Sequence, residues 1–267
     1  MFKTIKTEIE NKNFHIILDR PDERNAVNLP MMQEIGQAVD IAEKAFHAGD
    51  ARVLIVRAEG RAFSQGIDLT ALDDYVERYG ERWRDNLFAT TRTLQDVLTK
   101  LERSSLPSIC LIHGYCIGTG FEIALACDFR IVAERTRLSL PETRLGIVPD
   151  VGGTARLVNL IGSSRAKEVI LTGRTIDLSQ AEQWGMINYI VSKSDLMTKA
   201  NQLADELKQA APMAVNYAKR IINDIADIQR GLNIEAWAQA ALFRSEDFQA
   251  GVDVMQNKSY PVEWKNK

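Results

Sequence analysis

The sequence predicts an α/β domain followed by an all-helical region, and three observations lead to this fold class. Short apolar stretches typical of strands alternate along residues 5–191 with segments whose apolar residues recur every three or four positions, as in helices. The order strand, glycine-bearing turn, helix occurs twice. After Ser194 only helical patterns remain. We therefore expect a core of residues 1–195 and a helical C-terminal region of residues 196–267.

The chain opens with two stretches of alternating apolar and polar residues, 5–9 and 14–18, separated by a turn-like segment. This pattern predicts a β-hairpin. Apolar residues spaced three and four apart from Leu29 to Phe46 predict a helix with one buried face, ending near Gly49. The continuous apolar run at 52–57 is typical of a strand covered on both faces.

The middle of the chain continues the alternation. Residues 72–101 are highly charged but keep a helical apolar spacing, which indicates one or two amphipathic helices. A strand at 108–113 leads through a glycine turn into a helix at 121–127, and right-handed crossovers are expected between parallel strands. Further strands are expected at 129–132, near 137–140 and at 187–191, and further helices at 163–171, 178–184, 195–210, 213–229, 232–243 and 246–257.

Composition limits the possible functions. The net charge of −3 gives no basic field, so neither a nucleic acid nor a membrane is expected as a partner. The sequence has no signal-peptide pattern and no membrane-length apolar run, so a cytoplasmic protein is expected. Cys110, Cys116 and Cys127 lack paired spacing and are expected to be free thiols. Three histidines without a metal-binding pattern predict no metal site.

The first chemical motif is the segment HGYCIGTGFEIALACD at 113–128. Its small residues precede a helix, so backbone N–H groups of the first turn can approach and bind an anion. Its one acid inside the helix, Glu122, is a candidate catalytic group, although the helix dipole alone could favour it there. A dinucleotide site fits less well, because Ile123 stands where the fingerprint needs glycine or alanine.

The second motif is LPETRLGIVPDVGGT at 140–154, a turn-rich stretch between apolar anchors. It carries two acids eight residues apart, Glu142 and Asp150. Either acid alone could be a solvated loop carboxylate. A serine-hydrolase site is excluded, because the sequence contains neither a G-x-S-x-G elbow nor a Ser-His-Asp set.

Together the two motifs resemble the crotonase superfamily, the enoyl-CoA hydratases and isomerases. The pieces that carry the resemblance are G-x-x-x-G-x-G-x-E at 114–122 and P-E-T-R-L-G-I-V-P-x-x-G-G at 141–153, and the similarity extends over residues 5–258. It implies a core of repeated ββα units wound as a superhelix, with a helical oligomerisation region. It also implies an acyl-CoA substrate and no further cofactor.

The resemblance implies a role for four of these residues. The backbone N–H groups of Ile67 and Thr119 would hold the thioester oxygen, which becomes negative only as the enolate forms. Glu122 and Glu142 would be the two carboxylates of a hydratase, one activating water toward C3 and the other exchanging a proton at C2. Thr119 replaces the usual glycine, and Ile67 the alanine of many hydratases. Hydration of a 2-enoyl-CoA is therefore the expected reaction.

Asp150 opens an alternative within the same family. Members that convert 3,5-dienoyl-CoA to 2,4-dienoyl-CoA carry an acid at this place, so Glu142 and Asp150 would be the proton-transfer pair. Those isomerases typically have aspartate where this chain has Glu122, which favours hydration. A different class, a non-catalytic binding protein with the same fold, is disfavoured because the chain retains the acids and both oxyanion loops.

The resemblance also places coenzyme A against two loops and implies a homotrimer or homohexamer. The CoA-binding candidates, of which the basic ones could equally be surface cations, are Arg24, Ala26, Ala62, Ser64, Gly66 and Lys258. The helical tail carries more apolar residues than a peripheral helix needs, which predicts burial against another subunit or against its own domain. These residues are Leu232, Ala236, Trp237, Ala240, Ala241, Phe243 and Phe248.

Overall fold

A six-stranded sheet forms the centre of the computed structural model, which describes residues 2–71, 80, 85, 87–225 and 229–257. The strand order is β1-β2-β3-β4-β6-β8. The hairpin β1–β2 is antiparallel and every other pairing is parallel. The strands are β1 (Ile5–Glu10), β2 (Asn13–Leu18), β3 (Val53–Ala58), β4 (Ser108–Ile112), β6 (Phe129–Ala133) and β8 (Tyr189–Val191).

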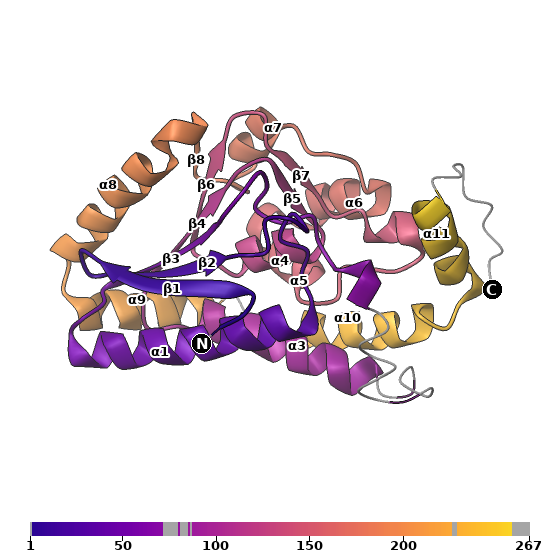
Figure 1. The fold of residues 1–267 in the computed structure, drawn as a ribbon, viewed down its shortest axis with the longest axis horizontal. Helices are drawn as coiled ribbons and strands as arrows, with labels where there is room; N and C mark the ends of the chain where they lie inside the picture. Colours follow the sequence, from indigo (N-terminus) through magenta and orange to yellow (C-terminus); the bar gives the residue numbers. More distant parts are fainter. Residues whose placement is uncertain (1, 72–79, 81–84, 86, 226–228, 258–267) are drawn as a thin grey trace.

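Helices cover both faces of this sheet (Figure 1). Helices α1 (Leu29–Ala48) and α3 (Leu87–Glu102) pack in the larger hydrophobic cluster, which includes Leu54 and Val56 of β3. The neighbouring residues Val53 and Ile55 point to the opposite face and pack with α8 (Leu196–Gln209). The continuous apolar run of β3 is therefore explained by burial on both faces, as predicted. Of the helical stretch predicted at 72–101, the part from residue 87 is confirmed as α3, and most of residues 72–86 lie outside the described residues.

A second, two-stranded sheet extends the core toward the site. It pairs β5 (Tyr115–Ile117) with β7 (Arg137–Ser139), and β5 runs directly into α4 (Thr119–Leu125). The sequence did not predict β5, because its three residues stand in a glycine turn and form a strand only by pairing with β7. Nor did it predict α5 (Gly153–Ile161), which begins at a glycine and has a glycine as its N-cap. The helices α6 (Ser163–Thr172) and α7 (Leu178–Gln183) follow close to their expected bounds.

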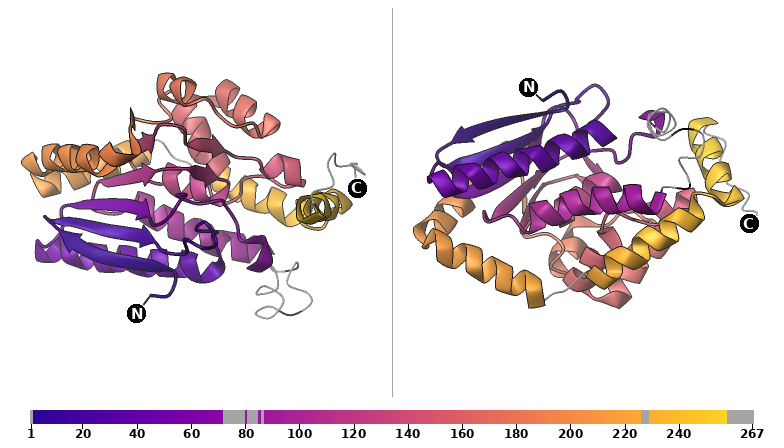
Figure 2. Two further views of the ribbon diagram at one scale, coloured as in Figure 1. Left: turned by 45° about the horizontal axis from the view of Figure 1, so that its top comes forward. Right: turned by 90° about the horizontal axis from the view of Figure 1, so that it is seen from below.

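The C-terminal helices follow one another around the sheet, and α11 lies at the end of the molecule away from α8 (Figure 2). They are α8, α9 (Pro212–Ile225), α10 (Gln229–Leu242) and α11 (Glu246–Asn257). The side chains of Leu232, Ala236 and Phe248 are buried within the chain itself, whereas Trp237 is 69% exposed. Within the described residues, no helix has the length and apolar character needed to cross a bilayer.

Candidate active site

Two glycine-bearing loops, one after β3 and one at β5, come into direct contact. The N–H of Ser64 donates to the carbonyl of Tyr115 (2.9 Å), and the N–H of Ile117 donates to the carbonyl of Ser64 (3.1 Å). Gly66 has φ +97°, and a Cβ at this position would lie 2.9 Å from the carbonyl oxygen of Ile117. Only glycine permits this approach without displacing the backbone.

The contact brings Ile67 and Thr119 to the wall of one cavity. Ile67 is held because Val27 bonds on both sides of it, donating to the carbonyl of Gly66 and accepting from the N–H of Asp68, each at 2.8 Å. Thr119 is the first residue of α4, where N–H groups have no partner within the helix. Within the described part of the chain, neither amide donates to a protein acceptor. Both can therefore bind an oxygen in the cavity.

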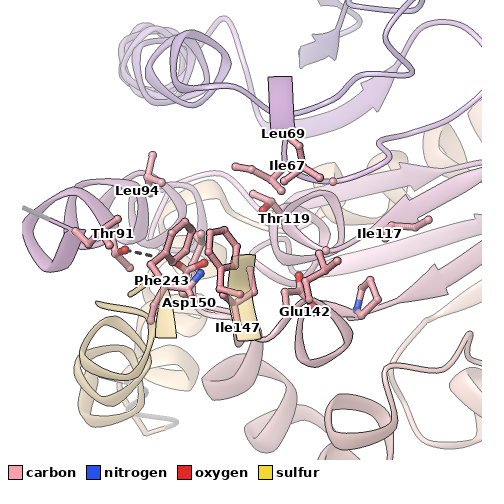
Figure 3. A pocket seen from close by; sticks show the side chains of 18 of the residues that line it. Ile67, Leu69, Thr91, Leu94, Ile117, Thr119, Glu142, Ile147, Asp150 and Phe243 are labelled. Carbon is pink, nitrogen blue, oxygen red and sulfur yellow. Dashed lines mark hydrogen bonds between the residues drawn. The ribbon is translucent and has the colours of Figure 1, made fainter. Parts of the chain in front are cut away.

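Two carboxyl groups, Glu142 and Asp150, border the same cavity (Figure 3). Glu142 lies in the short 3-10 helix η3 (Glu142–Leu145), next to the turn that precedes α4: a Cβ on Gly118 would lie 2.8 Å from its Oε1. Asp150 lies toward α3 and accepts a hydrogen bond from the hydroxyl of Thr91 (3.2 Å). Glu142 thus lies beside the turn at Gly118, and Asp150 lies beside α3.

Burial governs the ionisation of both acids. Loss of solvent raises the pKa of Glu142 to about 8, and repulsion by Asp150 adds to the rise. Burial also raises the pKa of Asp150 to about 7, against the hydrogen bonds of Thr91 and Gln239 that favour its charged form. Because the two groups titrate together, these values belong to the pair. Near neutral pH the pair holds about one proton, and can both donate and accept one.

Glu122 is close to these acids but does not border the cavity. Its side chain is buried, and its Oε1 accepts hydrogen bonds from the N–H groups of Val151 and Gly153, both 2.8 Å. Burial, and then the charges of Asp150, Glu142 and Glu235, raise its pKa well above the ordinary value. The structure therefore gathers all three predicted acids, places Glu142 and Asp150 on the cavity wall, and places Glu122 behind the turn that carries Asp150.

The structure adds Glu235 to this group of acids, and the sequence analysis did not single it out. Glu235 of α10 is buried and accepts hydrogen bonds from the N–H groups of Gly152 (2.7 Å) and Ala155 (2.6 Å). A signal was present in the sequence, since Glu235 and Gln239 interrupt the apolar face of α10 formed by Leu232 and Ala236. Acidic residues are seldom buried on such a face without a hydrogen-bonding partner.

The predicted CoA-binding residues divide into different settings. Gly66 borders the cavity. Ala26, Ala62 and Ser64 are buried where the loop at 24–26 meets the loop at 62–66. The hydroxyl of Ser64 donates to the carbonyl of Asn25 (2.7 Å) and accepts from the N–H of Gly66 (3.1 Å). Arg24 is exposed. Lys258 lies outside the described residues.

The rest of the cavity wall is mostly apolar. It is formed by side chains from α3, from the turn before α5 and from the two last helices with their connection. They include Leu87, Leu94, Ile147, Phe243 and Phe248. Such a wall suits a hydrocarbon chain, and the polar groups at its inner end suit a reacting carbonyl. Among the described residues, no group of three histidine, cysteine or acidic side chains is arranged to hold a metal ion.

Comparison with known proteins identifies the family. The family model of enoyl-CoA hydratase/isomerase matches residues 8–267. The Enoyl-CoA isomerase/hydratase fer4 of Mycosarcoma maydis is 34% identical over 257 residues, covering 93% of this chain and 91% of that protein. The mitochondrial Delta(3,5)-Delta(2,4)-dienoyl-CoA isomerase of Dictyostelium discoideum is 29% identical, covering 98% of this chain and 91% of that protein.

Solved structures agree with the sequence comparisons. An enoyl-CoA hydratase/isomerase from Xanthobacter autotrophicus Py2 superposes with a TM-score of 0.84 at 28% identity, covering 96% of this chain and 94% of that one. The crotonase-like fold expected from the motifs is thereby confirmed. The chain therefore belongs to the enoyl-CoA hydratase/isomerase family and is an enzyme of that family.

Proposed function

We propose that the enzyme isomerises a 3,5-dienoyl-CoA to a 2,4-dienoyl-CoA, with Glu142 and Asp150 as the proton-transfer pair. One observation carries this choice: both acids border the cavity that the amides of Ile67 and Thr119 also reach, whereas Glu122 does not. For this reason we prefer isomerisation to the hydration that was expected from the sequence. A relative named as a dienoyl-CoA isomerase is consistent with the choice.

The reaction would move one proton into the pair and another out of it. The reaction starts from the one-proton form of the pair in which Asp150 holds the proton and Glu142 is ionised. The carboxylate of Glu142 removes the proton at C2, and the electron pair delocalises onto the thioester oxygen. The amides of Ile67 and Thr119 stabilise that oxygen as its charge develops. The carboxyl group of Asp150 then donates a proton at C6, and the double bonds shift from positions 3 and 5 to positions 2 and 4. Proton exchange between Glu142 and Asp150 restores the starting state.

Hydration of a 2-enoyl-CoA is the second candidate. Glu122 favours it, since hydratases of this family carry glutamate at this place and this carboxyl group is held by the turn adjoining Asp150. The name of the relative fer4 covers both isomerase and hydratase activities. Hydration would use Glu122 and Glu142 as the pair that polarises water.

A direct assay separates the two reactions. The purified enzyme is offered a 3,5-dienoyl-CoA and, separately, a 2-enoyl-CoA, and the ultraviolet absorbance of each conjugated system is followed. Isomerisation predicts that the conjugated 2,4-dienoyl thioester appears with the first substrate. Loss of the enoyl signal with the second substrate alone would show hydration instead, and no change with either would contradict both proposals.

Two further proposals follow from the same chemistry. We propose that coenzyme A enters only as part of the substrate and that no further cofactor is needed, because the isomerisation moves protons without net oxidation. Full activity after dialysis against a metal chelator would be the expected result. We also propose that Arg24, Gly66 and Lys258 contact coenzyme A and that the buried residues Ala26, Ala62 and Ser64 shape the loops that hold it. We further propose that the protein is a homotrimer or homohexamer.

A further inference from the structure

The turn that carries Asp150 leads into α5, and the start of α5 lacks a side-chain cap. The first N–H groups of a helix have no partner inside the helix, and a side chain at the cap position usually accepts from them. Here the cap residue is Gly152, with φ +100°. A Cβ on Gly152 would overlap the guanidinium of Arg156, so no capping side chain fits. The N–H groups of this turn must find acceptors elsewhere.

Two buried carboxyl groups from distant elements supply those acceptors. Glu122 of α4 accepts from Val151 and Gly153, and Glu235 of α10 accepts from Gly152 and Ala155. All four bonds are between 2.6 and 2.8 Å. Each carboxyl group therefore binds two N–H groups, and together they hold the turn from two sides.

The carbonyl groups of the turn are held as well. The amide nitrogen of Gln95 donates to the carbonyl of Asp150 (2.6 Å), and the guanidinium of Arg156 donates to the carbonyl of Val151 (3.0 Å). Arg156 is itself paired with Glu102 at 3.0 Å. Backbone on both sides of the Asp150 side chain is thus fixed by α3, α4, α5 and α10.

We infer that Glu235 is a positioning residue for Asp150: through the N–H groups of Gly152 and Ala155 it fixes the turn that aims the Asp150 carboxyl group into the cavity. The inference rests on the proposed role of Asp150 in proton transfer. Glu235 touches backbone and does not border the cavity. It connects the C-terminal helix α10 to the reaction, so the helical region would serve catalysis as well as packing.

The charges around Glu235 are consistent with this role. Burial raises its pKa to about 8, while the N–H groups of Ala155 and Gly152 and the charge of Arg156 favour its ionised form. Repulsion by Asp150 adds to the rise. In the ionised form both oxygens accept these bonds without a proton of their own, and in the protonated form the hydroxyl oxygen keeps a lone pair for its N–H group, whereas the NH2 group of an amide could not accept.

The variant that tests the inference is Glu235→Gln. Glutamine keeps one acceptor oxygen but turns its NH2 group toward the second backbone N–H, so a donor faces a donor and that side of the turn must shift. Displacement of a catalytic group by about 1 Å can cost on the order of 100-fold in rate. We expect kcat to fall by about 10- to 100-fold, with KM for the acyl-CoA little changed and with a shifted pH profile of kcat.

A matched control is Glu34→Gln. Glu34 also accepts two backbone N–H groups, those of Lys3 and Thr4, each at 2.8 Å, but it lies on α1 near the N-terminus and away from the cavity. It should lower the melting temperature without changing kcat or the pH profile. A kcat for Glu235→Gln equal to that of the wild type and the control would overturn the inference. If Glu235→Gln does not fold, Glu235→Asp, which keeps the carboxylate but shortens it, decides by the same comparison.

A double-mutant cycle with Asp150→Asn distinguishes this inference from the proposed function on which it rests. If Glu235 acts through Asp150, adding Glu235→Gln to Asp150→Asn lowers kcat no further. If Glu235→Gln lowers kcat by the same factor in the Asp150→Asn background as in the wild type, Glu235 does not act through Asp150. The inference would then fail, while the proposed proton-transfer role of Asp150 would stand. Full activity of Asp150→Asn alone would instead refute the proposed proton-transfer pair.

Discussion

Glu142 is the acid that both candidate reactions require. It is 8% exposed, it borders the cavity beside the oxyanion loop, and its Oε2 has no hydrogen-bond partner among the described residues. A buried oxygen without a partner is costly, so such groups call for an explanation. We explain the unpartnered Oε2 of Glu142 by its proposed role, which is to exchange a proton with the bound acyl group.

The Glu142→Gln variant should lose turnover and keep substrate binding. The amide has nearly the shape of the acid but cannot exchange the proton at C2, so kcat should fall by about 100-fold or more. Calorimetric titration with a saturated acyl-CoA should give a dissociation constant close to that of the wild type, because the amides of Ile67 and Thr119 remain. Retained turnover would remove Glu142 from the mechanism.

The proposed proton-transfer pair predicts a bell-shaped pH profile of kcat/KM. The Glu142 and Asp150 pair has pKa values of about 8 and about 7. Below about pH 7 both groups become protonated and the base is lost, and above about pH 8 both become ionised and the acid is lost. The profile of kcat/KM measured on free enzyme should show both limbs, and Asp150→Asn should remove one of them.

The same raised values make the folded state less stable as pH rises. The acids bind protons more tightly in the folded chain, where burial raises the pKa, than in the unfolded chain with its ordinary values. The free energy of unfolding should therefore fall from about pH 4 to about pH 8. Glutamine cannot ionise, so the Glu142→Gln variant avoids the cost of a buried charge at high pH. Its free energy of unfolding should exceed that of the wild type near about pH 9 and differ little from it near about pH 4. A less stable variant at the higher pH in thermal unfolding would contradict this.

At the scale of elements, the site depends on loops that contact each other through glycine. The Ser64–Ile67 loop after β3 and the Ile117–Gly120 segment at the start of α4 were predicted to hold the two amides. Spacing along the sequence could not show that they touch, because residues 64 and 117 meet only through parallel pairing of Ser64 with Cys116. Their contact is a consequence of the order of β3 and β4 in the sheet.

Gly66→Ala should therefore damage catalysis more than stability alone explains. The new Cβ would meet the carbonyl oxygen of Ile117 at 2.9 Å and push the two loops apart. Gly49→Ala is the matched control, since Gly49 also has positive φ but no atom within 4 Å of the new Cβ. Both changes should cost roughly 1–2 kcal/mol of stability from the backbone conformation, but only Gly66→Ala should also lower kcat. Equal kcat for the two variants would contradict the proposed oxyanion site.

At the scale of the whole molecule, α9 carries a row of exposed apolar side chains of the kind that subunit interfaces cover. Four apolar side chains at intervals of four residues, Met213, Tyr217, Ile221 and Ile225, are 50–82% exposed, and Ile222 is 65% exposed. The same helix buries Asn216 and Lys219 against the core. An apolar stripe of this length on the outside is typical of a subunit interface. The tail residues Leu232, Ala236 and Phe248, in contrast, are already covered by their own chain.

Ile221→Asp should disrupt the proposed trimer or hexamer. A charge in the centre of the stripe would lose its hydration on association, which is costly without a partner charge. Light scattering should give the mass of an oligomer for the wild type and a smaller mass for the variant. A wild-type mass equal to the 30.0 kDa of one chain would refute the proposed assembly.

The sequence by itself predicted the family, most of the strands and helices, and the loops and acids that are candidates for the site, because these are encoded in local spacing and in two long motifs. It missed β5 and α5. Only the tertiary structure decided how the acids divide. Glu122, Glu142 and Asp150 come from α4, η3 and the turn before α5, and which of them face the cavity depends on how these elements pack. Glu235 enters the same cluster from α10, far along the chain, because its oxygens bind N–H groups that Gly152 cannot cap.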